Sequence, residues 1–401
     1  MFSPLDTRYF SMLKEFSSIA GEVNFVYFMH LWSLAYAECT NNETYLPAYE
    51  NREELYRRVQ VKEKVCKHQM VAVLQVLEED FPDVVFHYGL TSEDIMHNAR
   101  CTQVVLSINL INLVLKEVEA GIREFEKEVT IPILAHTHGQ PATPVRLGPY
   151  LRGKAKYLNL VKPEFRLGGS NGQLTALRYA SKMTDCKDLA QGWLKKIQQR
   201  IDGLEEIQVC IPNDRIGLLQ IGPSNDATFL SGISLVVKMR SLTRALWDHC
   251  YRKILFPSSE ILQSGSSAMP HKINPIDFEN AEGCFSNAYH ILLNSFESNV
   301  DSRGLRDLSN SVVNRQMIEG WVYLYLGLKS LTKGMSKSSY SIDRILYELR
   351  QNPECLTELL RYYMQVEEGR DDPYWDLKKN PPNNFDNTIK RMENWSVLER
   401  K

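Results

Sequence analysis

The stretch VVLSINLINLVLKEVEAGIREFEKEV, residues 104–129, decides the fold class of this chain. Its apolar residues recur at a spacing of three or four positions, and no proline interrupts them. This spacing is typical of one broad face of an α-helix, so the stretch predicts a long amphipathic helix. The predicted apolar stripe consists of Val105, Ile108, Leu110, Ile111, Val114, Leu115 and Val118.

The prolines divide the rest of the chain in a way that supports the same fold class. None occurs between positions 82 and 132, 163 and 212, 223 and 257, or 275 and 353. Proline breaks helix interiors, so these four gaps predict four or five long helices, and an alternating strand pattern is almost absent. We therefore expect an all-α fold with a central bundle of long helices. Changes in composition place domain boundaries near residues 80 and 333, which gives domains 1–80, 81–332 and 333–401.

Composition and charge limit the possible partners and compartment. The chain has 401 residues, of which 43% are apolar and 24% charged, and its net charge is -2. Binding to a nucleic-acid backbone needs a surplus of Lys and Arg, so no nucleic-acid partner is expected. The eight cysteines are scattered without C-x-x-C spacing, which indicates reduced thiols and no metal site. The apolar run at residues 25–37 is too short to span a bilayer, so a cytoplasmic protein is expected.

Two polar segments outside the predicted helices carry residues of chemical interest. In HTHGQPATP (136–144), His138 sits in a turn-rich segment that can be a rigid turn with local hydrogen bonds. A histidine there can also act as an acid or a base, whereas a metal site is poorly supported because no third ligand is indicated. In LTSEDIMHNAR (90–100), Thr91 and Asp94 resemble a helix-capping box. The same helix end, with the hydroxyls of Thr91 and Ser92, can bind an anion.

Two further segments permit both a structural and a functional interpretation. In SRGLRDLSNSVVNR (302–315), Ser311 and Arg315 share one helical face, which is either a solvated basic surface or an anion site together with Arg306. The segment SGSSAMPHKINPIDFEN (264–280) is rich in small residues and proline, as a simple linker would be. It also holds Ser266 and Lys272, and it can form a loop that closes over a substrate.

The segment at 264–280 closely resembles the signature loop of the fumarase/aspartase superfamily, whose members eliminate fumarate from a substrate. Within that superfamily the chain most resembles the adenylosuccinate lyases. SPLDTRY, LTSEDI, HTHGQPATP, SSAMPHKINPIDFEN and RDLSNS occur in the same order as in that family, and the resemblance covers nearly the whole chain. It implies a three-domain all-α fold, a homotetramer with active sites built from three subunits, and no metal or organic cofactor.

The resemblance also implies roles for individual residues. His138 matches the general acid and Ser266 the general base, while Glu279 matches the carboxylate that pairs with the histidine. Lys272 and Asn274 match the residues that hold the substrate carboxylate and the developing carbanion. The residues that match substrate and phosphate contacts are Arg8, Tyr9, His68, Thr91, Ser92, Thr137, Gln220, Arg306, Ser311 and Arg315.

The implied reaction is the β-elimination of fumarate from adenylosuccinate, which gives AMP, and from SAICAR, which gives AICAR. The residue types fit this chemistry, because Lys272 and Asn274 can stabilise the extra charge on the substrate carboxylate. A histidine such as His138 can protonate the leaving nitrogen.

The chain departs from the family pattern mainly near the expected nucleotide contacts. Gln69 stands where the family usually has Asp, Thr175 where it has Gly, and Asn310 where Asp is common. The chain is also shorter than typical members, so its C-terminal domain is expected to be shortened. Two alternatives stay open, namely a sister lyase that acts on another succinyl substrate and a non-catalytic helical scaffold.

Overall fold

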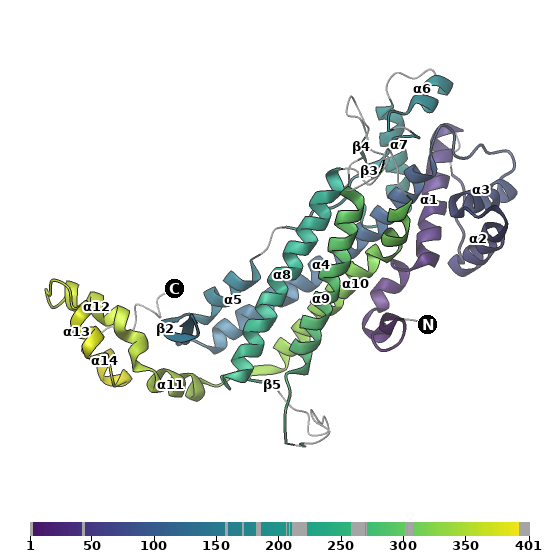
Figure 1. Ribbon diagram of the computed structural model, residues 1–401. Helices are drawn as coiled ribbons and strands as arrows, with labels where there is room; N and C mark the ends of the chain where they lie inside the picture. Colours follow the sequence, from purple (N-terminus) through teal and green to yellow (C-terminus); the bar gives the residue numbers. More distant parts are fainter. Residues whose placement is uncertain are drawn as a thin grey trace. The chain divides into compact units, whose positions relative to one another are not determined.

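The computed structural model describes residues 3–41, 45–156, 159–170, 172–181, 186–205, 207, 209–210, 223–257, 269, 271–300, 303 and 308–392. Helices dominate these residues, and the strands form short two-stranded sheets, so the predicted all-α fold class is confirmed (Figure 1). Four of the described helices have 25 or more residues. They are α4 (Ser92–Glu128), α8 (Pro223–Tyr251), α9 (Ile276–Val300) and α10 (Ser309–Ser336).

The chain forms two compact units, and the four long helices contribute residues to both. Unit 1 comprises residues 1–113, 157–237 and 284–326. Its shorter elements are η1 (Pro4–Asp6), η2 (Phe10–Met12), η3 (Lys14–Ser18), α1 (Glu22–Thr40), α2 (Arg52–Cys66), α3 (Gln69–Asp80), β3 (Phe165–Arg166), α6 (Thr175–Ser181), α7 (Lys187–Gln198) and β4 (Val209–Cys210). β3 and β4 pair in parallel.

Unit 2 comprises residues 114–156, 238–283 and 327–401. Its shorter elements are β1 (Ile133–Thr137), β2 (Gln140–Val145), α5 (Leu147–Ala155), β5 (Leu255–Pro257), β6 (Ser338–Tyr340), α11 (Ile342–Gln351), η4 (Pro353–Leu356), α12 (Thr357–Val366), α13 (Tyr374–Lys379) and α14 (Phe385–Arg391). Both of its sheets, β1–β2 and β5–β6, are antiparallel pairs. The domain boundaries near residues 80 and 333 stay predictions.

The long helix α4 follows the apolar stripe read from the sequence. Every predicted member of the stripe is buried except Leu110, which is half-buried. By length and apolarity α4 would be long enough to cross a membrane, but 61% of its most apolar window is buried inside the protein, as in a core helix.

Small residues bring α8, α9 and α10 close together within unit 1. A Cβ atom at Gly232 of α8 would lie 2.8 Å from the ring of Trp321 in α10 and 3.3 Å from Leu292 in α9. The missing side chain therefore gives the fully buried Trp321 its space, and the three helices pack without a void at this level.

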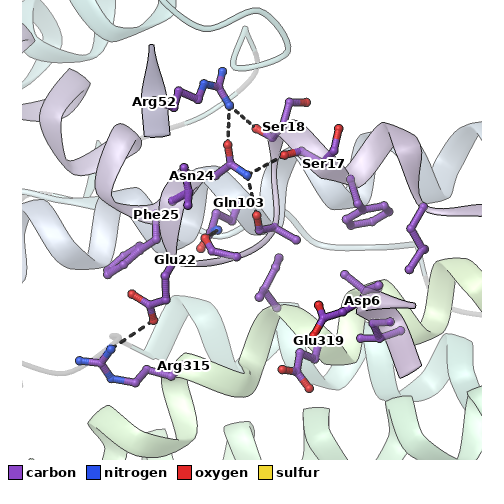
Figure 2. A pocket seen from close by; sticks show the side chains of 18 of the residues that line it. Asp6, Ser17, Ser18, Glu22, Asn24, Phe25, Arg52, Gln103, Arg315 and Glu319 are labelled. Carbon is purple, nitrogen blue, oxygen red and sulfur yellow. Dashed lines mark hydrogen bonds and ion pairs between the residues drawn. The ribbon is translucent and has the colours of Figure 1, made fainter. Parts of the chain in front are cut away.

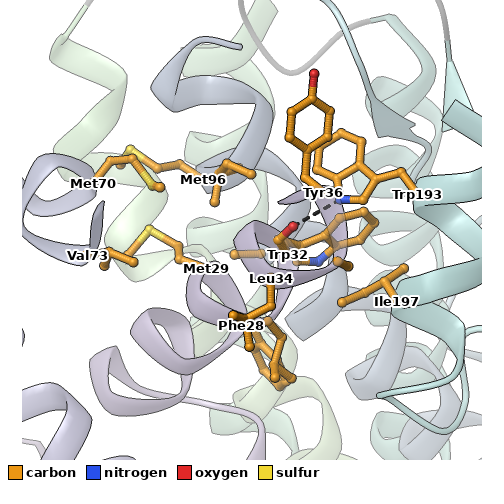
Figure 3. Packing of buried hydrophobic residues seen from close by; sticks show 14 of the residues in the cluster. Phe28, Met29, Trp32, Leu34, Tyr36, Met70, Val73, Met96, Trp193 and Ile197 are labelled. Atoms are coloured by element: carbon orange, nitrogen blue, oxygen red, sulfur yellow. Dashed lines mark hydrogen bonds between the residues drawn. The ribbon is translucent and has the colours of Figure 1, made fainter. Parts of the chain in front are cut away.

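The core of unit 1 is built around two buried tryptophans (Figure 3). The rings of Trp32 and Trp193 meet edge to face with centroids 5.0 Å apart, an arrangement that aromatic quadrupoles favour. Both indole N–H groups are satisfied, because Trp193 donates to the Trp32 carbonyl at 3.0 Å and Trp32 donates to the Thr102 hydroxyl at 2.9 Å. These bonds join α1, α4 and α7 in one core.

A buried carboxylate, Asp94, holds the beginning of α4 to the segment that follows β3. Its oxygens accept the backbone N–H groups of Gly168 at 2.8 Å, of Gly169 at 3.0 Å and of Thr91 at 2.9 Å. The guanidinium of Arg166 lies 3.2 Å from the same carboxylate. The bond from Thr91 is the carboxylate half of the predicted capping box, so Asp94 caps its own helix and also anchors a distant loop.

The prediction of a long helix in the proline-free gap at 163–212 was wrong. Its described residues form the seven-residue α6 and the twelve-residue α7. The reason is local, because Gly169 and Gly172 have φ values of +65° and +73°, which a continuing helix cannot contain. The remaining gaps hold the four long helices, two of them in the last gap.

Replacement of Asp94 by Asn should destabilise unit 1 strongly. Asp94→Asn leaves the buried Arg166 guanidinium without its carboxylate, and breaking a buried ion pair costs about 3–5 kcal/mol. Urea unfolding followed by tryptophan fluorescence measures this loss, since Trp32 and Trp193 lie in the same core. The exposed Asp188→Asn is the matched control, and equal stability of the two variants would contradict this role of Asp94.

The buried histidine of α1 should make the protein sensitive to acid. Burial lowers the pKa of His30 from 6.5 to about 3, with Arg200 and Arg58 adding to the effect. Between these pH values the unfolded chain binds a proton that the folded chain does not, so stability falls as pH falls below 6.5. His30→Phe should reduce this slope by about 1.4 kcal/mol per pH unit in urea titrations between pH 6.5 and 4.5. An unchanged slope would contradict the burial of a neutral imidazole.

Candidate active site

His138 lies at the tip of the β1–β2 hairpin. Thr137 pairs with Gln140 across the turn, which leaves His138 and Gly139 as its two central residues. Their φ values of +54° and +72° are those of a turn that matches the twist of antiparallel strands. Positive φ is unfavourable for histidine, and such strain gathers at functional sites. Thr137 and His138 are exposed, so their side chains are accessible to a bound molecule.

A half-buried ion pair between Arg252 and Glu348 supports this hairpin. Arg252, at the end of α8, donates to the carbonyl oxygen of Leu134 in β1 at 2.8 Å. The same guanidinium donates two hydrogen bonds to Glu348 of α11, at 2.8 and 2.6 Å. A bidentate pair of this kind has a fixed geometry. In the other strand, the hydroxyl of Thr143 donates to Glu358, so the C-terminal helices hold both strands.

The signature segment is anchored at both of its ends in unit 2. Before it, β5 ends at residue 257 and pairs with β6, and Ser341 donates to the Ile254 carbonyl at 3.0 Å. After it, α9 begins at Ile276, and Asp277 forms an ion pair with Lys333 at 2.8 Å. These anchoring partners come from the last turn of α10, from β6 and from Ser341, the N-cap of α11.

The structure places the predicted residues of the signature segment as follows. Lys272 is exposed, and its N–H donates to the Met269 carbonyl at 3.0 Å. Asn274 is half-buried just before α9, and Glu279 is exposed in the first turn of that helix. Glu279 accepts the indole N–H of Trp247 at 3.3 Å. The predicted residues Ser266, Gln220 and Arg306 lie outside the described residues.

In unit 1, three predicted residues stand at the beginnings of two helices. Ser92 is the first residue of α4, and Thr91 precedes it, both half-buried. His68 caps α3, where its Nδ1 accepts the N–H of Val71 at 3.4 Å. Helix N-termini present free N–H groups and a positive dipole end, so both places favour a negative charge.

His87 is a candidate functional residue that the sequence did not lead us to predict. Burial lowers its pKa, and the neighbouring His68 lowers it further, while Asp94 opposes the shift. His87 is therefore close to both the His68 cap and the LTSED segment. Its Nδ1 is buried without a hydrogen-bond partner among the described residues, and its φ is +62°. The one signal in the sequence was its position close to Gly89 and LTSED, in HYGLTSED. Such a position does not by itself indicate that the histidine is buried.

One predicted anion-binding residue, Arg315, borders a cavity of about 1040 Å³ in unit 1 (Figure 2). Ser311 and Arg315 lie one turn apart in the first two turns of α10, as their spacing predicted. Arg315 lines the cavity together with Asp6 and Glu319. Arg8 and Tyr9 lie in the turn between η1 and η2, whose residues Asp6 and Phe10 line the cavity. In the same unit, Phe16 of η3 meets Tyr325 of α10 with ring centroids 5.0 Å apart.

The side chains that line the cavity carry charges of both signs. Glu22 and Arg315 form an ion pair across it at 3.1 Å, and Arg52 donates to Asn24 and to the Ser18 carbonyl (Figure 2). A volume of this size is that of small-molecule sites. In the described part of the chain, no three His, Cys, Asp or Glu side chains are placed to hold a metal ion.

Comparison with known proteins agrees with this architecture. The fold is similar to that of 3-carboxy-cis,cis-muconate lactonizing enzyme from Pseudomonas putida, with a TM-score of 0.66 and 14% identity over 99% of both chains. It is also similar to β-carboxy-cis,cis-muconate cycloisomerase from Acinetobacter calcoaceticus, with a TM-score of 0.65 and 12% identity over 96% of this chain and 89% of the other. The chain therefore shares the fold of these two enzymes.

Sequence comparisons are more specific. A family model described as "Adenylosuccinate lyase C-terminal" matches residues 302–395. Adenylosuccinate lyase of Dictyostelium discoideum is 26% identical over 94% of this chain and 87% of its own length. That of Escherichia coli K12 is 28% identical over 82% of this chain and 73% of its own length. Over most of its length the chain is thus similar to adenylosuccinate lyases, and its C-terminal part matches the model of that family.

Loss of the Glu348 carboxylate should loosen the hairpin that carries His138. Glu348→Gln removes the charged partner of Arg252, and a hydrogen bond to a charged group contributes about 1.5–3 kcal/mol. Amide hydrogen exchange in residues 133–145 should accelerate. The exposed Glu354→Gln provides the control. If exchange in the hairpin stays at the wild-type rate, Arg252 does not act as its support.

Proposed function

We propose that this protein is an adenylosuccinate lyase, which eliminates fumarate from adenylosuccinate to give AMP and from SAICAR to give AICAR. The observation that carries the proposal is the joint presence of His138 at an exposed, strained hairpin tip and of the signature segment in a chain similar to adenylosuccinate lyases. A purely structural protein has no physical need for this combination of an acid, a base and a cation.

In the proposed mechanism, Ser266 removes a proton from the Cβ carbon of the succinyl group. The electron pair moves into the adjacent carboxylate, and Lys272 and Asn274 stabilise the added negative charge. The C–N bond then breaks, its electron pair goes to the departing nitrogen, and His138 donates a proton there. The products are fumarate and the nucleotide. Glu279 holds the histidine in its proton-donating form.

The nucleotide phosphate is proposed to bind where α10 begins. Ser311 and Arg315 offer a hydroxyl and a guanidinium at a helix N-terminus, which already favours an anion. Arg8, Tyr9 and Arg306 would complete this set. Thr91, Ser92, Thr137, His68 and Gln220 would contact the rest of the substrate.

We further propose that the active site is composite and forms in a homotetramer. His138 and Thr137 are fully presented at the end of a hairpin, and Lys272 and Glu279 are also exposed. Catalytic side chains need a shielded environment, and a neighbouring subunit would supply it. We propose the cytoplasm as the location, because its reducing conditions keep cysteines as free thiols, as the described cysteines are.

The decisive experiment is a spectrophotometric assay of the purified protein with adenylosuccinate, with AMP and fumarate identified as products. We expect turnover, and the same preparation should also cleave SAICAR. A well-folded protein that releases fumarate only from another succinyl substrate would identify a sister lyase. One that releases none from any succinyl compound would support the scaffold alternative.

Replacement of the proposed base should abolish chemistry without weakening binding. Ser266→Ala should lower kcat by about 10²–10⁴-fold, the contribution of a positioned acid–base group, and leave KM and the melting temperature near their wild-type values. Ser267→Ala is the matched comparison at the adjacent serine and should keep most of the activity. If Ser267→Ala lost activity and Ser266→Ala kept it, Ser267 would be the base.

A further inference from the structure

Glu22 connects two parts of unit 1 that the proposed function assigns to substrate binding. Its Oε1 accepts a hydrogen bond from Nη1 of Arg315 at 3.1 Å, and its Oε2 accepts one from Nε2 of Gln69 at 2.9 Å. Gln69 is the first residue of α3, directly after the His68 cap. Figure 2 shows the carboxylate of Glu22 directed at the Arg315 guanidinium. One carboxylate therefore links the proposed phosphate site to the helix end that carries His68.

The bond between Glu22 and Arg315 is of a kind that an incoming anion can replace. A single N–H of the guanidinium reaches Glu22, and the side chains are 36% and 44% exposed, so water screens the pair. A phosphate group carries more charge than a carboxylate and accepts two parallel N–H bonds from arginine. It would therefore displace Glu22 from Arg315.

Gln69 gives Glu22 a second partner that does not depend on Arg315. Gln69 is buried, with 7% of its surface exposed, and its Oε1 has no hydrogen-bond partner among the described residues. Its amide N–H₂ group can donate to a carboxylate, whereas an aspartate in its place could only accept at neutral pH. Glutamine thus holds Glu22 in place after Arg315 has turned to another anion.

We propose that Glu22 is a specificity-determining counter-ion that occupies Arg315 until the substrate phosphate replaces it, and that Gln69 keeps Glu22 in position. The proposal rests on the assignment of Arg315 as a phosphate ligand in the proposed function. Glu22 neutralises the guanidinium against weak monovalent anions, and it competes with the substrate for the same N–H groups. Removal of its charge then strengthens phosphate binding, which is the opposite of what loss of a structural contact produces.

The test compares Glu22→Gln with the wild-type protein by two measurements. Calorimetric titration with inorganic phosphate should show Kd lowered by about two- to fivefold, the range that loss of a partly exposed competing ion pair explains. Steady-state assays with adenylosuccinate should show KM lowered to a similar extent and kcat unchanged. Gln69→Asp should act in the opposite direction, with higher values of both Kd and KM, because it adds a second carboxylate beside Glu22.

The control is Glu79→Gln, which removes an arginine-paired carboxylate at the surface of the same unit. Glu79 pairs with Arg58 and Lys62, and its loss should leave both phosphate affinity and KM unchanged. A Glu22→Gln variant with weaker or unchanged phosphate binding would overturn the proposal. If the wild-type protein does not cleave adenylosuccinate, the proposed function fails by itself. Tighter phosphate binding by Glu22→Gln would still support the counter-ion role in that case.

Discussion

The carboxylate of Asp94 is the constraint on which the architecture of unit 1 depends. It is fully buried, and it satisfies amide groups of two segments that are about seventy residues apart in sequence, together with the Arg166 guanidinium. A buried charge is tolerated only when its oxygens are satisfied in this way. With Asp94 in place, Asn98 one turn later exchanges two hydrogen bonds with the backbone of Arg166. Polar contacts alone therefore hold the first turns of α4 to β3 and the segment after it. The same turns carry Thr91 and Ser92, so a structural requirement also determines where a candidate substrate contact lies.

In unit 2, the segment that carries a candidate residue is held by contacts from several elements rather than by one buried carboxylate. Its hairpin projects an exposed His138 from two short strands, and an isolated two-stranded hairpin is only marginally stable. Arg252 supplies rigidity by joining the backbone of β1 to Glu348, and Tyr340 of β6 donates its N–H to Glu128 at 3.0 Å. β6 is also the partner of β5, the strand that leads into the signature segment. The connection between α10 and α11 thus pairs with the strand that leads into the signature segment, and α11 holds the hairpin through Glu348 and Arg252. The C-terminal helices therefore hold the hairpin that carries His138, although they contribute no predicted catalytic residue.

Much of the fold could be predicted from the sequence, because helix periodicity and proline position are local signals. The stripe from Val105 to Val118 and the cap at Thr91 and Asp94 were of this kind. The second role of Asp94, as an anchor for Gly168 and Gly169, was not predictable, since it depends on a contact over a long sequence separation. The prediction of a long helix at 163–212 failed because glycines with positive φ interrupt the helix there and because β3 pairs with β4. His87 was missed because its burial and its proximity to His68 arise only in three dimensions, although it stands close to LTSED in the sequence. The residue types of the candidate site came from the motifs, whereas their exposure and supports came from the structure.

The substitution of glutamine for the usual aspartate at position 69 acquires a physical meaning from these contacts. An aspartate there would place a second carboxylate beside Glu22, and two negative charges would then face the one guanidinium of Arg315. Like charges at hydrogen-bond distance repel each other, and Glu22 would be driven further toward Arg315. Glutamine removes that repulsion and adds a donor, so Glu22 and Arg315 form a neutral pair. If Arg315 binds a dianionic phosphate as proposed, a guanidinium that is neutralised loosely rather than tightly favours that binding. The departure at Gln69 is therefore compatible with nucleotide binding, and it changes the competition for Arg315 rather than the chemistry at His138.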